Sequence, residues 1–199
     1  MKPLLIHTSE FVPVTLEFLA NDLVNRFALK NNKTLRQTIA TRRYQHLASQ
    51  VYDAYKQCLD MQLGDYLLTL KQSGDDFYKR FLNAYGDDTY CWFRIKDHLK
   101  DKGIYSYVIA NSALYIGRCT DYFSKRINQG YGQIHPKNCY IDGQSTNCRL
   151  NSLINANHDK IQFYVCCMED RAQIIESERN FIHDLQPQWN ISLRQRTIL

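Results

Sequence analysis

A carboxylate within an apolar helical stripe is the first feature of this sequence that could do chemistry. The stripe follows one face of a helix expected over residues 171–185 and consists of Ile175, Glu178, Ile182 and Leu185. Spacings of three, four and three residues are typical of a helix face that packs against a core. A buried carboxylate is costly unless it is paired or binds a cation. Glu178 is therefore expected either to form a salt bridge with a nearby arginine or to hold a cation.

Two tyrosines and an arginine could complete such a site. Tyr105 follows Gly103 and Ile104 in one short β-rich run, and Tyr115 begins the triplet Tyr-Ile-Gly in the next run. Arg126 follows in an expected helix. A phenol donates and accepts hydrogen bonds, and a guanidinium holds an anion through paired hydrogen bonds. Taken singly, the tyrosines are better explained as strand aromatics, and Arg126 is equally compatible with a surface position.

Taken together, these residues resemble the GIY-YIG nuclease superfamily. Its members typically carry the triplets GIY and YIG, an arginine in the next helix, a glutamate in a later helix, and a proline and an asparagine just beyond it. The same order is completed here by Arg126, Glu178, Pro187 and Asn190. The resemblance covers roughly residues 102–194. Five landmarks in the right order favour a nuclease site over unrelated structural roles.

The resemblance implies a divalent-metal-dependent deoxyribonuclease that hydrolyses phosphodiester bonds. Glu178 would hold one Mg²⁺ or Mn²⁺ per active site, because both ions suit carboxylate oxygen. Tyr105 would act on the attacking water as a base, directly or through hydrogen bonding, and Tyr115 would position the water or the phosphate. Arg126 would hold the scissile phosphate.

Two further residues are expected to support the site. Gly117 would let the substrate approach the backbone closely, and Asn190 would brace the site rather than react. The sequence departs from the family pattern at Gly130, where many members carry a histidine one turn after the arginine. His135 lies five residues later in a loop and is an alternative base.

The implied partner is double-stranded DNA. The loop after Arg126 is similar to that of certain GIY-YIG type II restriction endonucleases, which favours a site-specific restriction enzyme. Cutting both strands of a palindrome favours a homodimer. The candidate DNA-contacting side chains are Arg118, Asn138, Gln144, Asn147 and Arg149, with Arg118 equally compatible with a solvated strand end. Phosphate contacts are expected from Arg36, Arg42 and Arg43, unless these are only the solvated side of a helix.

Two alternatives stay open. The segment from Glu178 to Asn190 is similar to the closing segment of the catalytic domain in nucleotide-excision-repair nucleases of the superfamily, which favours a structure-specific repair or mobile-element nuclease. A non-catalytic DNA-binding module could reuse the same fold, although it would not need a carboxylate in an apolar stripe.

The amino-acid composition indicates the class of protein and the compartment in which this chemistry is expected. The 199 residues are 44% hydrophobic, which is ordinary for a globular protein. The net charge of +5 is only a weak indication of an anionic partner such as nucleic acid. Seven cysteines without a CxxC pair, and no secretory signal, predict reduced thiols in the cytoplasm. No apolar run is long enough for a membrane helix. A zinc site at His135, Cys139 and Cys148, with Cys166–Cys167 nearby, is less favoured than core thiols, because the spacing is too loose.

The elements that must position these residues predict an α+β fold with two regions. Residues 1–101 are expected to form a helical region with a role in gripping DNA or in dimerisation, its helices lying over 16–27, 35–58, 63–70, 77–85 and 89–99. Residues 102–199 are expected to form a small nuclease domain, a three-stranded antiparallel sheet flanked by helices. Its strands are expected over 105–109, 114–117 and 161–167, the first two forming a hairpin, and its helices over 122–129, 147–157 and 171–185.

Overall fold

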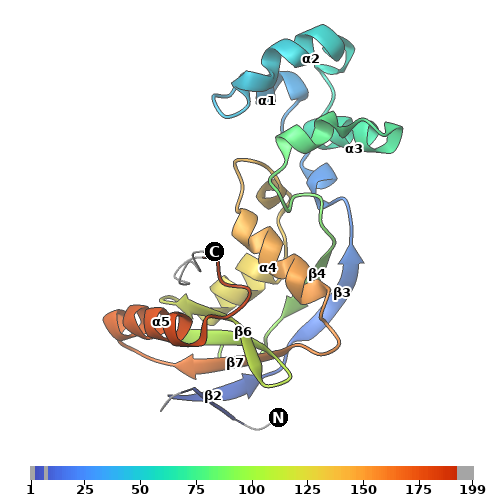
Figure 1. Cartoon of the computed structure of the whole chain (residues 1–199). Helices are drawn as coiled ribbons and strands as arrows, with labels where there is room; N and C mark the ends of the chain where they lie inside the picture. Colours follow the sequence, from blue (N-terminus) through green and yellow to red (C-terminus); the bar gives the residue numbers. More distant parts are fainter. Residues whose placement is uncertain (1–2, 7–8, 192–199) are drawn as a thin grey trace, which may run out of the picture. The chain divides into compact units, whose positions relative to one another are not determined.

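An antiparallel sheet carries the two tyrosines of the predicted site, and the chain is of the α+β class (Figure 1). The computed structural model describes residues 3–6 and 9–191, so residues 192–199 of the expected nuclease domain lie outside the described residues. The strands are β1 (Leu4–Ile6), β2 (Ser9–Val14), β3 (Glu17–Leu23), β4 (Tyr90–Arg94), β5 (Gly103–Ile109), β6 (Ser112–Cys119) and β7 (Gln162–Cys167). The α-helices are α1 (Leu35–Ile39), α2 (Ala48–Ala54), α3 (Leu63–Ser73), α4 (Ser145–Asn155) and α5 (Arg171–Leu185). No described helix is long and apolar enough to cross a membrane.

Two compact units divide the chain, and both are discontinuous in sequence. One comprises Met1–Ala20, Trp92–Gln133 and Ala156–Leu199, and the other comprises Asn21–Cys91 and Ile134–Asn155. The sequence instead predicts one boundary after residue 101. The first unit therefore adds the N-terminal strands to most of the expected nuclease segment, and residues 134–155 group with the helical residues.

The main sheet has five strands in the order β1-β2-β7-β5-β6, so the expectation of three strands is wrong. The two extra strands come from the N-terminus, where Val12 of β2 lies opposite Val165 of β7. The expected hairpin is confirmed in β5 and β6. Ala110 and Asn111 at its tip both have positive φ, 48° and 62°, as a type I′ turn requires.

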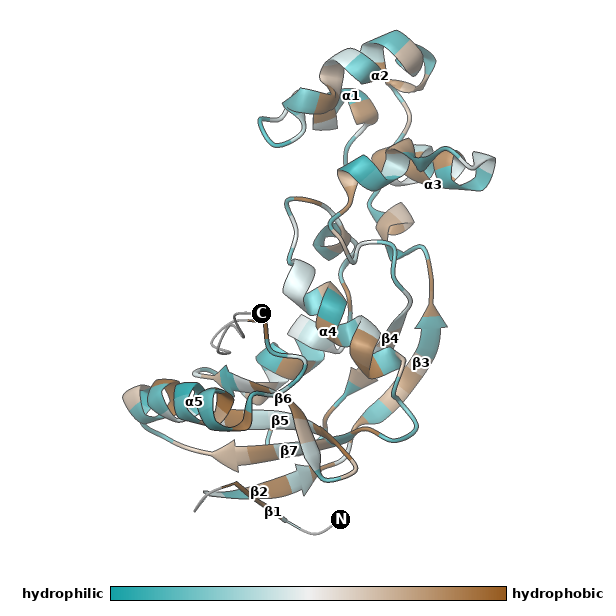
Figure 2. Ribbon diagram, viewed as in Figure 1, coloured by the Kyte–Doolittle hydropathy of each residue, from teal (hydrophilic) through white to brown (hydrophobic). Residues whose placement is uncertain are grey.

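Each face of β5 is covered by a different element. On one face, Ile104 and Ile116 pack with Ile174, Phe181 and other apolar residues, most of them on α5 and the neighbouring strands. Figure 2 shows the apolar segments of β2 and β7 in brown. The opposite face is aromatic. Its rings belong to Tyr105, Tyr107, Tyr115, Phe123, Tyr131 and Phe163. Burial on both faces makes β5 the centre of this unit.

Two predicted helices are strands in the structure. Residues 16–27 contain β3, which pairs with β4. Asp22 and Asn25 end this strand in left-handed conformations with φ of 55° and 56°, which short polar side chains tolerate and a helix does not allow. Residues 89–99 contain β4, whose aromatic sequence Tyr-Cys-Trp-Phe fits a pleated strand better than a helix.

The remaining helical predictions are confirmed in part. Thr34 caps α1 in a capping box with Gln37, but the long helix expected over 35–58 is broken into α1, α2 and short 3₁₀ turns. The break follows Thr38 and Thr41, whose hydroxyls bond to backbone carbonyls and so compete with the helix. The other helices expected over 63–70, 147–157 and 171–185 correspond to α3, α4 and α5, whereas 77–85 holds a 3₁₀ helix, Asp76–Phe81.

Candidate active site

Tyr105 and Tyr115 lie on the adjacent strands where the sequence predicts them, and both are on the aromatic face of the hairpin. Their ring centroids lie 6.1 Å apart. Tyr105 is fully buried and lies opposite Gly117 in the register of β5 and β6. A Cβ atom at Gly117 would lie 2.5 Å from the Tyr105 hydroxyl oxygen and 2.8 Å from the Tyr115 ring. Gly117 therefore makes room for the two tyrosine rings. This differs from the reason expected from the sequence, which is the close approach of a substrate to the backbone.

A third tyrosine links these phenols to Arg126. The Tyr105 hydroxyl donates to the Tyr131 oxygen at 3.0 Å, and the Tyr115 and Tyr131 oxygens lie 3.4 Å apart. The Arg126 Nε donates to the Tyr105 oxygen at 3.3 Å, and the guanidinium carbon lies 4.7 Å from the centre of the Tyr131 ring. The structure thus brings three of the predicted residues together around Tyr131, to which the sequence analysis assigns no role.

The helix type explains why Tyr131 was missed. Residues Ser124–Tyr131 form a π-helix, η5, rather than the α-helix expected over 122–129. Its hydrogen bonds span five residues, as in the 2.6 Å bond from the Gly132 N–H to the Ile127 carbonyl. Arg126 and Tyr131, five apart, therefore stack, whereas in an α-helix they would diverge. The only signal in the sequence is a tyrosine five residues after the arginine.

The environment of Tyr105 and Tyr115 favours their protonated forms. Burial raises the pKa of Tyr105 well above its usual range, and the neighbouring Tyr115 and Tyr131 raise it further, whereas Arg126 lowers it. Burial also raises the pKa of Tyr115. A fully buried phenol with a raised pKa is poorly placed to take a proton directly from water. Of the two expected modes for Tyr105, hydrogen bonding fits this geometry and direct base action does not.

Glu178 forms a salt bridge with Arg118, which is one of the two roles expected for it. Its Oε1 accepts a hydrogen bond from the Arg118 backbone N–H at 3.1 Å, and its Oε2 pairs with the Arg118 guanidinium. The Glu178 side chain is 13% exposed. The buried face of α5 is formed by Ile174, Phe181 and Ile182, so the helix is turned relative to the predicted stripe and Leu185 is exposed. Glu178 consequently lies at the edge of the buried face.

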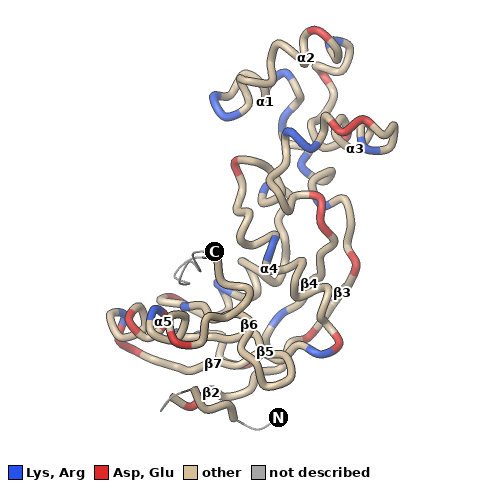
Figure 3. Tube along the Cα trace, viewed as in Figure 1, with Lys and Arg blue, Asp and Glu red and all other residues tan. Residues whose placement is uncertain are grey.

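Arg126 and Glu178 line one open cleft of about 450 Å³. The cleft residues are Arg118, Cys119, Thr120, Asp121, Tyr122, Lys125, Arg126 and Glu178. Charges of both signs also alternate along α5 (Figure 3). Lys125 pairs with Asp121 at 2.8 Å, as Arg118 pairs with Glu178. Among residues 3–6 and 9–191, no carboxylate pairs with Arg126.

The carboxylates of this cleft fit a hard divalent cation. Mg²⁺ is commonly held by one or two carboxylates, with water and substrate phosphate completing its six ligands. Glu178 and Asp121 supply oxygen ligands of this kind to the cleft. Both are engaged with cationic side chains, so binding of a cation requires the Arg118 guanidinium to leave Oε2.

Asn190 is tied to the strand that carries Tyr115 and Gly117. Its amide nitrogen donates to the Ile116 carbonyl at 2.8 Å, and its amide oxygen accepts the Ile116 N–H at 2.9 Å. The backbone N–H of Trp189 donates to Leu114 at 2.7 Å. The buried asparagine therefore extends the ladder at the outer edge of β6, which agrees with a bracing role.

The expected DNA-reading residues belong mostly to the second unit. Asn147 is buried and donates to Gln144 at 2.7 Å, so its amide is not presented to a ligand. Gln144 is exposed, and Asn138 and Arg149 are half-buried. Arg118, in the first unit, is occupied by Glu178.

The basic residues after α1 gather at a second cleft. Arg42, Arg43, His46 and Ile141 line an open cleft of about 840 Å³ in the second unit. Arg36, in contrast, pairs with Asp60 at 3.0 Å. Of the three arginines expected to contact phosphate, two are therefore exposed together and the third is balanced by a carboxylate.

The loop histidine and its neighbouring cysteines have structural partners. The His135 Nδ1 accepts the Lys137 N–H at 3.2 Å and caps the short helix Pro136–Cys139. Cys139 and Cys148 are fully buried, and the Cys139 thiol donates to the Tyr90 oxygen at 3.9 Å. These contacts agree with core thiols.

Comparison with known proteins adds nothing to this geometry, because no family model, curated protein or solved structure matches the chain.

Proposed function

We propose that the protein is a divalent-metal-dependent endonuclease that hydrolyses phosphodiester bonds in double-stranded DNA. The observation that carries the proposal is the state of Arg126. This cation is held by Tyr105 and Tyr131, has no carboxylate partner among the described residues, and lines the same cleft as Glu178. An unbalanced guanidinium beside a carboxylate is the pairing that a phosphodiester and its metal ion require.

Arg126 and the three tyrosines have separate roles in the proposed reaction. Arg126 holds the scissile phosphate through its terminal nitrogens, because its Nε is already bonded to Tyr105. Tyr105 and Tyr131 position that guanidinium and reduce the reorganisation needed when charge develops on the phosphate. Tyr115, the half-buried member of the network, orients the phosphate or the attacking water.

Glu178 would hold Mg²⁺ or Mn²⁺, with Asp121 as a second carboxylate in the cleft. A bound ion of this type lowers the pKa of coordinated water and offsets charge on the phosphate. For Glu178 to hold the ion through Oε2, the Arg118 guanidinium would leave that oxygen. The Arg118–Glu178 pair thus keeps the carboxylate compensated without a cation.

The most specific form of the proposal is a site-specific type II restriction enzyme that acts as a homodimer. It is supported by the similarity of the loop after Arg126 to restriction endonucleases and by the exposed Arg42 and Arg43, which would contact phosphates. The second candidate is a structure-specific repair or mobile-element nuclease, favoured by the segment from Glu178 to Asn190.

A digest with several substrates tests the proposal and separates its forms. Plasmid DNA, branched duplexes and damaged duplexes are incubated with the protein in Mg²⁺ or in EDTA. Discrete plasmid fragments that require Mg²⁺ are expected. Cutting confined to branched or damaged DNA would favour the repair form. DNA binding without cutting in Mg²⁺ or Mn²⁺ would contradict the enzyme and leave a binding module.

A further inference from the structure

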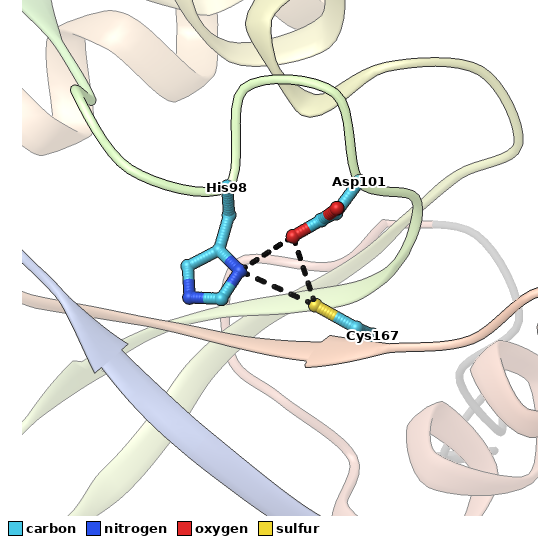
Figure 4. Close-up of side chains that lie close together, drawn as sticks. All are labelled: His98, Asp101 and Cys167. Atoms are coloured by element: carbon cyan, nitrogen blue, oxygen red, sulfur yellow. Dashed lines mark hydrogen bonds and ion pairs between the residues drawn. The ribbon is translucent and has the colours of Figure 1, made fainter.

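Three side chains able to ligate a metal converge at a second place in the first unit (Figure 4). His98 and Asp101 lie between β4 and β5, and Cys167 is the last residue of β7. His98 Nδ1 lies 2.7 Å from Asp101 Oδ2 and 3.5 Å from Cys167 Sγ. The Cys167 sulfur lies 3.7 Å from the same Asp101 oxygen. None of the three lines the cleft of Arg126 and Glu178.

The triangle formed by these atoms resembles the ligand spacing around a tetrahedral zinc ion. Zn–S bonds of about 2.3 Å and Zn–N or Zn–O bonds of about 2.1 Å place sulfur about 3.6 Å from the other ligands, which lie about 3.4 Å apart. The two separations from Cys167 sulfur, 3.5 and 3.7 Å, agree with this geometry. The N···O separation of 2.7 Å is shorter because His98 and Asp101 share a hydrogen bond.

The backbone holds the three ligands in place. The Met168 N–H donates to the Lys102 carbonyl at 3.0 Å, which fixes the end of β7 beside Asp101. The Asp101 N–H donates to the His98 carbonyl at 3.2 Å and closes a turn. His98 itself has a left-handed φ of 57°, an uncommon conformation for a residue with a Cβ atom that persists only when the surroundings hold it.

We propose that His98, Asp101 and Cys167 form a zinc site with three protein ligands, the fourth position being left to water. An imidazole, a thiolate and a carboxylate suit Zn²⁺, whereas Mg²⁺ prefers oxygen ligands alone. The His98 and Asp101 side chains are 32% and 48% exposed, so an ion can enter from solvent. The inference does not depend on the nuclease proposal, because it concerns other residues and another metal.

A nucleophilic thiol is the competing interpretation of this cluster. Beside an activated nucleophile, the histidine uses one ring nitrogen for the nucleophile and the other for the orienting carboxylate. Here the His98 Nδ1 alone contacts both Cys167 and Asp101. Metal ligation therefore fits the cluster better.

The zinc-binding turn also anchors the helix that carries Arg126. The Phe123 N–H donates to the Asp101 carbonyl at 2.9 Å, and the Ser124 N–H donates to the Leu99 carbonyl at 3.2 Å. Ser124 is the first residue of η5. A zinc ion at the turn would thus tie the end of β7 to the start of η5 and stiffen both.

Cobalt titration tests the site with a spectroscopic signal from the thiolate. The reduced, EDTA-treated full chain is titrated with Co²⁺, and Zn²⁺ is then added to displace it. We expect a thiolate-to-cobalt charge-transfer band in the near ultraviolet and intense visible bands of a tetrahedral ion, which saturate with one equivalent. The band should be lost in Cys167→Ser and kept in Cys166→Ser, which changes the neighbouring half-buried thiol. His98→Asn should weaken binding without removing the thiol.

Two outcomes would overturn the site. One is the absence of any charge-transfer band in the wild-type protein. The other is a band that survives Cys167→Ser and is lost in Cys139→Ser, since the cobalt would then be bound by core thiols.

Hydrogen exchange gives a second test that does not use cobalt. Zn²⁺ should slow exchange of the Phe123 and Ser124 amides in the wild type and not in Asp101→Asn, and unchanged exchange in the wild type would contradict the link to η5.

Discussion

Arg126 differs from the other cations of its cleft in how it is held. Arg118 and Lys125 are each neutralised by a carboxylate, whereas Arg126 is held by an aromatic face and a phenol oxygen. Neither partner is a carboxylate. The guanidinium is therefore positioned without being neutralised, and an incoming phosphate supplies its first anionic partner.

Replacement of Arg126 should slow cleavage without unfolding the protein. Arg126→Ala is expected to lower the single-turnover rate by about 10²–10³-fold, the loss typical of one preorganised donor. Arg126→Lys should recover only part of the rate, because lysine keeps the charge and loses the Nε bond to Tyr105. Arg179→Ala, an exposed arginine on α5, is the matched control and should cleave at the wild-type rate. A loss confined to DNA affinity would argue against a role in the chemical step.

Arg118 should compete with metal ions for Glu178. Its removal in Arg118→Ala frees Oε2, so Mn²⁺ should bind the variant more tightly, by up to about fivefold, since an ion pair with an exposed partner is worth about 1 kcal/mol or less. Isothermal titration with Mn²⁺ measures the change. Lys102→Ala, which removes a cation paired with exposed Glu169, serves as the control. Weaker Mn²⁺ binding in Arg118→Ala would show that Arg118 does not compete with the ion for Glu178.

Among the secondary-structure elements, the hairpin of β5 and β6 depends on glycine at position 117, where any side chain would collide with Tyr105. A methyl group at Gly117 would lie 2.5 Å from Tyr105, whose ring is enclosed by Phe123 and Phe163. Gly117→Ala should therefore lower the free energy of unfolding by about 1–3 kcal/mol, the usual cost of overpacking. Urea unfolding measures it. In Gly130→Ala the added atom meets nothing closer than 3.5 Å, so stability should change little. Equal stability of Gly117→Ala and the wild type would remove this explanation of the glycine.

The hairpin and α5 were predictable because local signals sufficed. A short turn between β-rich runs predicts the β5–β6 hairpin. A register shift between Tyr107 and Val108 then sets Tyr107 opposite Tyr115 and Tyr105 opposite Gly117, so that Tyr105 and Tyr115 share one face. Asp170 caps α5 through the Gln173 N–H, and α5 spans Arg171–Leu185 as expected. Local pattern therefore located the tyrosines and the helix of Glu178.

The other parts depended on contacts that no local pattern contains. The strands β1 and β2 belong to the sheet because β2 pairs with the edge of β7, about 150 residues away along the chain. The π-helix turns Tyr131 toward Arg126, and α-helical spacing gives no hint of it. The sequence predicted an arginine or a cation as the partner of Glu178, but it could not identify which arginine, because Arg118 is 60 residues away along the chain.

At the scale of the whole molecule, buried phenols and thiols should make the fold sensitive to alkali. Burial raises the pKa of Tyr55 to about 12 and that of Cys91 to about 12, and it also raises the pKa of Tyr105 and Tyr115. In the unfolded chain these groups lose protons near pH 10 for Tyr and about pH 8.5 for Cys. Above those values the unfolded state binds fewer protons than the folded state, so stability falls as pH rises.

The free energy of unfolding in urea should therefore be nearly constant from pH 7 to 8 and clearly lower at pH 10.5. Ultraviolet absorption at 295 nm, which follows tyrosinate, should show ionisation of the buried tyrosines only with unfolding. Equal stability at pH 8 and pH 10.5 would mean that these side chains are not protected in the folded protein.

Cleavage by a matched pair of glutamate variants tests whether Glu178 is required for hydrolysis. Glu178→Gln removes the carboxylate in the cleft, and Glu176→Gln removes an exposed carboxylate two residues earlier on α5. Mg²⁺-dependent cleavage of plasmid DNA is measured for the wild type and both variants, with circular dichroism to check folding. We expect cleavage by the wild type and Glu176→Gln, and none by a folded Glu178→Gln. Cleavage at the wild-type rate by Glu178→Gln would contradict this requirement.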